Sequence, residues 1–234
     1  MRSSADRSIT SNALGIGIAS GAYALSFGAI AVASGLSVWQ AQVLSLGMFT
    51  GASQFAMIGV LGAGGSALAA VATAALLGAR NGLYALTLTS TLGLRGWRRI
   101  IGAQFMIDET TAMALAAAPD RAASRRAFWM TGLSIFVLWN LGTVIGALGA
   151  SLIGDPKALG LDAAIPAAFL ALLWPRLRSR DSVGIAVLGA IVAIILTPLT
   201  SPGVPVLCAA AVAIIVGLAT WKRGAMTTEA DGAR

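Results

Sequence analysis

Residues 11–33 read SNALGIGIASGAYALSFGAIAVA, and they lie in a longer run, from Ser8 to Ala79, that contains no Lys, Arg, Asp or Glu. Soluble domains carry charge on about a quarter of their residues. An ionised side chain at the centre of a bilayer costs about 2.5–3.5 kcal/mol on insertion scales. A charge-free run of this length therefore indicates a protein that lies within a lipid bilayer.

The whole chain has the composition of an integral membrane protein. It is 57% hydrophobic and only 11% charged over 234 residues, and a membrane span needs about 20 apolar residues. Apolar segments fall near residues 12–33, 40–63, 66–92, 100–118, 127–152, 161–177, 183–199 and 204–221. We predict an all-α, polytopic transmembrane helix bundle of about seven or eight segments. It forms one permease-like membrane domain over residues 1–234, with short polar tails at 1–11 and 222–234.

Basic residues gather between the apolar segments and give the chain its net charge of +7. The clusters are Arg95/Arg98/Arg99, Arg121/Arg125/Arg126, Arg176/Arg178/Arg180 and Lys222/Arg223. Such clusters mark cytoplasmic loops, so the charge reflects membrane topology and no nucleic-acid partner is expected. The rule places the C-terminus in the cytoplasm.

The same rule fits the first half of the chain less well. A cytoplasmic N-terminus followed by three full spans would place the loop at residues 95–99 outside the cell. Either that loop breaks the rule, or one early segment enters and leaves the bilayer on the same side. A discontinuous or re-entrant segment is attractive, because such backbone lines the substrate sites of transporters.

Several function classes are disfavoured by residues that the chain lacks. It has no histidine and a single cysteine, which removes Ser–His and Cys–His catalysis, His-ligated zinc and histidine proton relays. Both lysines lie at loop or span ends, which argues against a Ser–Lys dyad. We therefore expect no enzyme, no metal and no cofactor. Gly-x-x-x-Gly pairs receive no weight as dimer motifs, because 28 glycines produce such pairs by chance.

A polar island interrupts the second apolar segment at Thr50-Gly51-Ala52-Ser53-Gln54-Phe55. Small residues let a ligand approach the backbone, and Ser53 and Gln54 offer hydrogen-bonding groups that hydrocarbon cannot satisfy. The same residues also suit a tight helix crossing in which Ser53 and Gln54 bond a neighbouring helix.

Arg80 and Asn81, with Tyr84 one helical turn further on, stand inside the third apolar segment. An arginine in a span must face protein, water or a partner charge, and its planar fork suits a carboxylate. The alternative is a purely structural ion pair with Asp108 or Glu109.

The fourth apolar segment carries the two carboxylates Asp108 and Glu109. On a continuous helix Gln104, Asp108 and Thr111 share one face, and Glu109 points about 100° away. Two carboxylates and one arginine leave one carboxylate without a full counter-charge. Burial favours the protonated form of such a group, so it suits a proton carrier. The alternative is that both acids are solvated at the interface.

In this order, the motifs resemble those of the AzlC family, the large subunits of bacterial branched-chain amino acid exporters. The resemblance rests on Gly35-Leu36-Ser37, Gln40, Thr50–Phe55, Arg80-Asn81-Gly82-Leu83-Tyr84, Asp108-Glu109, Gly142–Ala147 and Leu161–Ala167. Two positions depart from the family: Asn81 replaces its usual histidine and Ile107 its usual threonine.

The resemblance implies a multi-pass permease of the bacterial inner membrane that works with a small AzlD-like subunit and exports valine, leucine, isoleucine or similar amino acids. Proton antiport is the expected energy source. We expect Ser53, Gln54, Arg80, Asn81 and Tyr84 to bind substrate, and Asp108 and Glu109 to bind its ammonium or carry a proton. The rival hypothesis is a non-transporting membrane scaffold in which the charged residues only lock helices together.

Overall fold

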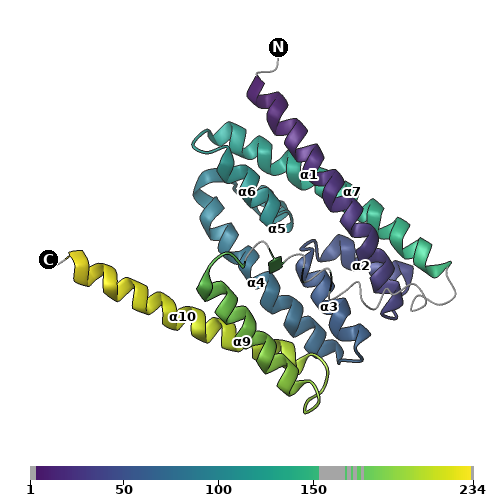
Figure 1. The fold of residues 1–234 in the computed structure, drawn as a ribbon. Helices are drawn as coiled ribbons and strands as arrows, with labels where there is room; N and C mark the ends of the chain where they lie inside the picture. The colour runs from purple at the N-terminus through teal and green to yellow at the C-terminus, as the bar shows by residue number, and fades with distance from the viewer. Residues whose placement is uncertain (1–3, 153–166, 168–169, 171–172, 175–176, 233–234) are drawn as a thin grey trace.

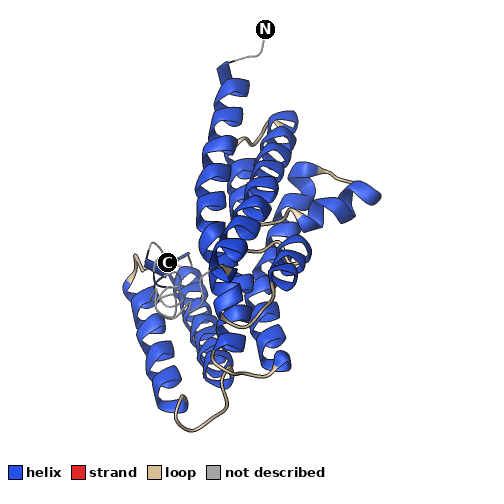
Figure 2. Cartoon of the chain, turned by 90° about the vertical axis from the view of Figure 1, so that its right-hand side faces the viewer, coloured by secondary structure: helices blue, strands red, loops and turns tan. Residues whose placement is uncertain are grey.

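The computed structural model describes residues 4–152, 167, 170, 173–174 and 177–232, and within these residues all regular elements are helices (Figures 1 and 2). In chain order the labelled helices are α1 (Ser4–Ala33), α2 (Val38–Gly47), α3 (Ala52–Gly62), α4 (Ala67–Leu92), α5 (Trp97–Gln104), α6 (Asp108–Ala116), α7 (Arg121–Ser151), α9 (Arg180–Leu196) and α10 (Val204–Gly232). The predicted all-α membrane helix bundle is confirmed.

Two long helices, α1 and α7, lie side by side and form the longest contact of the bundle (Figure 1). Asp6–Ala33 and Arg121–Ser151 within them are long and apolar enough to cross a membrane. The helices are parallel, because Gly21 lies beside Leu138 while Gly28 lies beside Thr143 and Ala147, further along both chains. α1 and α7 therefore begin at one end of the bundle and finish at the other.

Glycine permits this close crossing. A Cβ on Gly28 would lie 2.1 Å from the Thr143 carbonyl oxygen, and one on Gly146 would lie 2.0 Å from the Leu25 carbonyl oxygen. Two Gly-x-x-x-Gly pairs lie at this contact, Gly17/Gly21 on α1 and Gly142/Gly146 on α7. These glycine pairs therefore lie at a contact between two helices of the same chain. Small residues allow membrane helices to approach closely at such contacts.

The apolar segment 40–63 is not one helix but a hairpin of two short ones, α2 and α3. Ser37 caps α2: its Oγ accepts from the Gln40 N–H at 3.2 Å, and the Gln40 Oε1 accepts from the Ser37 N–H at 2.8 Å. The chain leaves helical conformation after Gly47 and resumes it at Ala52. α3 then ends at Gly62, where a Cβ would lie 2.7 Å from Ser34 Oγ. Since Ser34 follows the end of α1, the hairpin enters and leaves at the same end of the bundle.

A second hairpin, made of α5 and α6, enters from the opposite end. α4 carries the chain to that end, where Arg121 at the start of α7 donates to the Ser90 carbonyl at 2.8 Å. The helix is interrupted between Gln104 and Asp108, and α6 returns to its starting end, where Ser124 Oγ donates to the Ala114 carbonyl at 2.9 Å. The expectation that residues 104, 108 and 111 share one helix face is wrong, because the break separates Gln104 from the other two.

The tips of the two hairpins meet in the middle of the bundle. The Gln104 side chain donates to the carbonyls of Leu46 and Gly47, at 2.9 and 3.2 Å, and so bonds the last turn of α2. The rings of Phe49 and Phe105, one from each tip, lie 5.9 Å apart. The structure thus contains one hairpin of the kind that a re-entrant segment would form and a second one that the sequence analysis did not anticipate.

The last two described helices, α9 and α10, pack on each other, and α10 also contacts α4 (Figure 1). The turn between them lies at the end where the first hairpin enters, because a Cβ on Gly65 would lie 2.8 Å from the Pro202 carbonyl oxygen. The segment 161–177, with Pro166 and Pro175, falls largely outside the described residues. Trp39, Trp97 and Trp174 are exposed, as interfacial anchors should be, whereas Trp139 is buried.

The close contact between α1 and α7 at glycine predicts different effects of two alanine substitutions on stability. Gly146→Ala should lower the free energy of unfolding by about 1–3 kcal/mol, because the added methyl group meets the backbone of α1. Gly149→Ala on the same helix has open space and should change it by less than about 1 kcal/mol. Thermal unfolding in detergent measures both. Equal losses in the two variants would mean that the helices do not cross at Gly146.

The hairpin topology is testable by thiol labelling in sealed membrane vesicles. With Cys208 replaced by Ala, Ser37→Cys and Ala63→Cys should react with an impermeant maleimide from one side, because they flank the first hairpin. Arg95→Cys should react only from the opposite side. Labelling of Ser37→Cys and Ala63→Cys from opposite sides would show instead that residues 38–62 cross the membrane.

Candidate functional site

A small internal cavity of about 120 Å³ lies where the two hairpin tips meet. Its lining comes from the first tip, the second tip and the three long helices α1, α4 and α7: Tyr23, Phe49, Thr50, Gly51, Ala52, Arg80, Ile107, Asp108, Glu109, Ile135 and Trp139. Pockets for drug-sized ligands measure about 300–1,000 Å³, so this one suits a small solute. A larger groove at the end of the bundle where α5 and α7 begin contains none of the acidic residues.

An ion pair between α4 and α6 forms the charged part of the cavity. Arg80 Nη1 lies 2.9 Å from Asp108 Oδ2, and each side chain is 30% exposed. Asp108 and Glu109 are the first two residues of α6, where the partial positive charge of a helix N-terminus stabilises carboxylates. The helix break thus places both acids at the tip of the second hairpin, facing the one arginine of α4.

The buried side chain of Gln54 fixes the backbone of the first hairpin tip. Gly51 adopts a φ of 56°, which favours glycine, and it caps α3. Gln54 Oε1 accepts from the Gly51 N–H at 3.0 Å, and Gln54 Nε2 donates to the Leu44 carbonyl at 3.4 Å. Both ends of this amide are therefore occupied within the chain, and Gln54 positions the tip so that Gly51 and Ala52 line the cavity.

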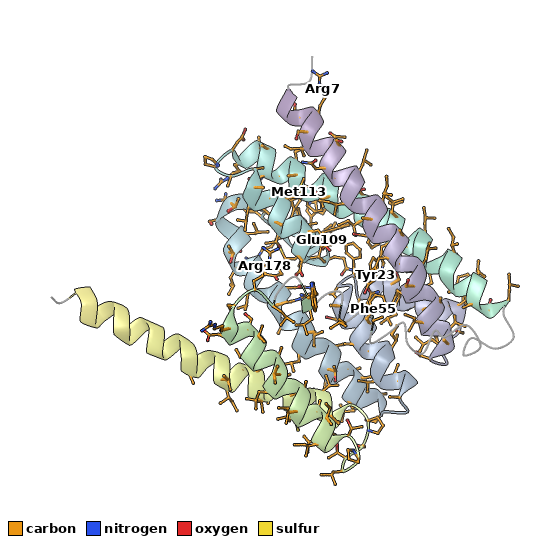
Figure 3. The ribbon with its side chains drawn as sticks, viewed as in Figure 1. Arg7, Tyr23, Phe55, Glu109, Met113 and Arg178 are labelled. Atoms are coloured by element: carbon orange, nitrogen blue, oxygen red, sulfur yellow. The ribbon has the colours of Figure 1, made fainter. Side chains whose placement is uncertain are left out.

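Aromatic side chains build the apolar wall. Tyr23 on α1 lies 4.9 Å from the ring of Phe55 and 6.2 Å from that of Trp139, and Figure 3 shows Tyr23 and Phe55 close together in the centre of the bundle. Glu109 is labelled in the same central region. Tyr23 and Trp139, with Phe49, Ile107 and Ile135, give the cavity an apolar part beside its charged part, and Phe55 packs behind Tyr23.

Four polar atoms around the cavity have no hydrogen-bond partner among the described residues. They are the Tyr23 hydroxyl, Thr50 Oγ1, Arg80 Nε and Trp139 Nε1. Buried polar side-chain atoms are usually satisfied by protein or water. Their convergence on one small space is the arrangement expected of a site that a polar solute or ordered water occupies.

The structure brings three of the seven predicted site residues together. Arg80, Asp108 and Glu109 line the cavity. The other four predictions, Ser53, Gln54, Asn81 and Tyr84, lie beside it on α3 and α4 but do not line it; Ser53 and Gln54 are buried.

Two aromatic residues of the wall were missed by sequence reasoning. Trp139 carried a signal, because it was the one tryptophan in the middle of an apolar segment instead of near an end. The signal at Tyr23 was weaker. It is one of only two tyrosines in the chain, and it lies far from both ends of the first apolar segment. A polar aromatic group at mid-span is a candidate site residue for the same reason as a buried charge.

The comparisons with known proteins agree with this architecture. The family model described as AzlC protein matches residues 15–153, which contain both hairpins and the cavity. The chain belongs to the AzlC family. An uncharacterized membrane protein of Archaeoglobus fulgidus is 35% identical over 77% of this chain and 80% of its own length. The inner membrane protein YgaZ of Escherichia coli is 31% identical over 74% of each chain. No solved structure matches.

The match to the AzlC family model ends near the end of α7. The matched residues hold most of α1 and α7, all of α4 and both hairpins. With relatives named as membrane proteins, this chain is a membrane protein of the AzlC family.

Gln54 and Gln40 form a matched pair for testing the tip. Both are third residues of a helix whose side chain accepts from the capping N–H, but Gln54 is fully buried and Gln40 is exposed. Gln54→Ala should lower the free energy of unfolding by about 1–3 kcal/mol, since it strands buried polar groups. Gln40→Ala should cost about 1 kcal/mol or less. Thermal unfolding in detergent measures both free-energy changes. Equal losses in the two variants would show that the Gln54 side chain does not stabilise the hairpin tip.

Proposed function

We propose that this chain is the large subunit of a two-component inner-membrane permease that exports branched-chain or similar apolar amino acids, driven by protons. The observation that carries the proposal is the cavity between the two hairpin tips, which places one arginine and two carboxylates beside an apolar wall. Family membership supports the same function.

The cavity offers each part of an amino acid a suitable partner. A substrate carboxylate is served by Arg80 and by the N-terminus of α3 at Ala52, where free backbone N–H groups of a first helical turn favour anions. The ammonium is served by Asp108 or Glu109. The branched side chain lies against the aromatic and aliphatic wall, and the small volume favours such a side chain over a long charged one.

Proton coupling follows from counting charges. Arg80 neutralises one carboxylate, so the second depends on a proton or on a substrate ammonium for neutrality in an apolar bundle. A substrate carboxylate that pairs with Arg80 competes with Asp108, and the freed acid then takes the ammonium or a proton. Substrate and protons thereby compete for the same two carboxylates, which is the requirement for antiport.

The hairpins supply access from two sides. Each enters from a different end, and their tips separate the cavity from the two ends of the bundle. The basic clusters at residues 95–99 and 121–126 lie at the end where α1 and α7 begin, and by the positive-inside rule we assign that end to the cytoplasm. With this assignment we propose a multi-pass protein whose C-terminus lies in the cytoplasm. A small AzlD-like subunit completes the transporter.

A scaffold without transport activity is the rival function, and the 2.9 Å Arg80–Asp108 pair is the observation that favours it. Ion pairs of this kind lock helices together, and apolar residues of similar volume often replace them without loss of stability. The two functions differ in what the carboxylates do after folding.

Leucine efflux from preloaded cells that express the chain with its small subunit tests the proposal. Asp108→Asn should lower the export rate by at least about tenfold, because an amide neither carries a proton nor fully pairs with Arg80. Asp181→Asn, at an exposed position in the first turn of α9, should leave it unchanged. A proton uncoupler should abolish export in the unmodified protein.

The double replacement Arg80→Met/Asp108→Leu separates permease from scaffold. A permease loses export although the protein still reaches the membrane, whereas a scaffold keeps its full function. Export that survives the double replacement would remove both residues from the transport mechanism, and unchanged efflux in Asp108→Asn would do the same for that carboxylate alone.

A further inference from the structure

A second, larger hollow lies at the end of the bundle where α5 and α7 begin. It is a groove of about 1410 Å³ between the C-terminal end of α4, the amphipathic helix α5 and the first turns of α7. Its lining is Thr89, Ser90, Gly93, Leu94, Arg95, Trp97, Arg98, Arg99, Ile101, Phe105, Arg121, Arg125, Trp129 and Leu133. Five arginines line it, and within the described part of the chain no Asp or Glu does.

Two of the five arginines hold the structure together. Arg121 donates to the Ser90 carbonyl, and Arg125 donates to the carbonyls of Leu92 and Gly93. These carbonyls end α4, so the two guanidinium groups stabilise the negative end of that helix. Their positive charge is offset by backbone dipoles and not by a carboxylate.

The other three arginines are uncommitted. Arg95, Arg98 and Arg99 are exposed, and the described residues provide no ion pair for any of them. Arg98 lies 5.8 Å from the centre of the Trp97 ring, which is a cation–π contact that leaves its hydrogen-bond donors available. The mouth of the groove thus carries a concentrated positive charge that lacks its counter-ion.

The groove also has an apolar lining made of Ile101, Phe105, Trp129 and Leu133. Leu133 is 51% and Ile101 42% exposed, whereas Phe105 is buried at the inner end. A site for a soluble anion needs only the charged mouth. A charged mouth next to a partly exposed apolar lining matches a molecule with an anionic head and a hydrocarbon tail.

We propose that this groove binds an anionic phospholipid. Arg95, Arg98 and Arg99 hold its phosphate, and an acyl chain lies along Phe105, Trp129 and Leu133. Phe105 also belongs to the tip of the second hairpin, so a bound lipid braces the element that carries Asp108 and Glu109. This lipid site is separate from the central cavity and does not depend on what the cavity transports.

Retention of lipid by the purified full-length protein in a mild detergent tests the proposal. Native mass spectrometry, with phosphatidylglycerol titrated against phosphatidylcholine of the same acyl chains, gives relative affinities. The groove variant is Arg95→Gln/Arg98→Gln/Arg99→Gln. The control Arg7→Gln/Arg178→Gln/Arg180→Gln removes the same charge from exposed arginines outside the groove, two of which are labelled in Figure 3. Soluble glycerol 3-phosphate serves as a competitor that has a headgroup and no tail.

The expected result is a preference for phosphatidylglycerol that falls by at least about tenfold in the groove variant and is kept by the control. Glycerol 3-phosphate should compete poorly, because it cannot occupy the apolar lining. Competition by glycerol 3-phosphate at the affinity of the lipid would overturn the proposal in favour of a soluble-anion site. Equal losses in the two variants, or no preference for the anionic lipid in the unmodified protein, would also overturn it.

Discussion

The arrangement of this protein depends on the neutralisation of an arginine placed inside an apolar bundle. Arg80 lies in the third apolar segment, where an isolated charge is expensive, and it pairs with Asp108 on a helix that begins at that residue. A carboxylate reaches this position because the fourth segment breaks at Phe105–Ile107 and restarts. A continuous helix would have left Asp108 and Glu109 in its middle, whereas the restart places both acids in the first turn of α6. The ion pair therefore links the break in one hairpin to the middle of a long helix.

Both breaks leave backbone groups without helical partners, and side chains from the hairpins satisfy part of that need. Gln54 serves the first tip, Gln104 bonds the last carbonyls of α2, and Thr110 Oγ1 accepts from the Ile107 N–H at 3.1 Å. Hydrocarbon tolerates irregular backbone only where protein or a water-filled space surrounds it. The cavity at the meeting point of the two tips is thus a consequence of breaking two helices at one depth. The two hairpins reach this cavity from opposite ends of the bundle.

Much of this could be predicted from the sequence, but the tertiary pairing could not. The absence of charge between Ser8 and Ala79 predicts a membrane protein, and the basic loops leave two topologies open, of which one contains a re-entrant segment. The position of the first break has a local signal in Thr50–Phe55. The second break has none, because Phe105-Met106-Ile107 reads as ordinary helix and only packing against the first tip explains it. Trp139 and Tyr23 are far apart in sequence, so their approach to Arg80 is visible only in the fold.

The central claim is that an apolar amino acid occupies the cavity between the tips. Thr50→Cys, in a chain whose Cys208 is replaced by Ala, places a thiol on the lining of that cavity. The measurement is the rate of its modification by a small thiol reagent in membranes, with and without added amino acids. The account predicts saturable protection by leucine, isoleucine and valine, none by aspartate or lysine, and no protection of Ala63→Cys at the hairpin entrance. A modification rate at residue 50 that no branched-chain amino acid changes would contradict it.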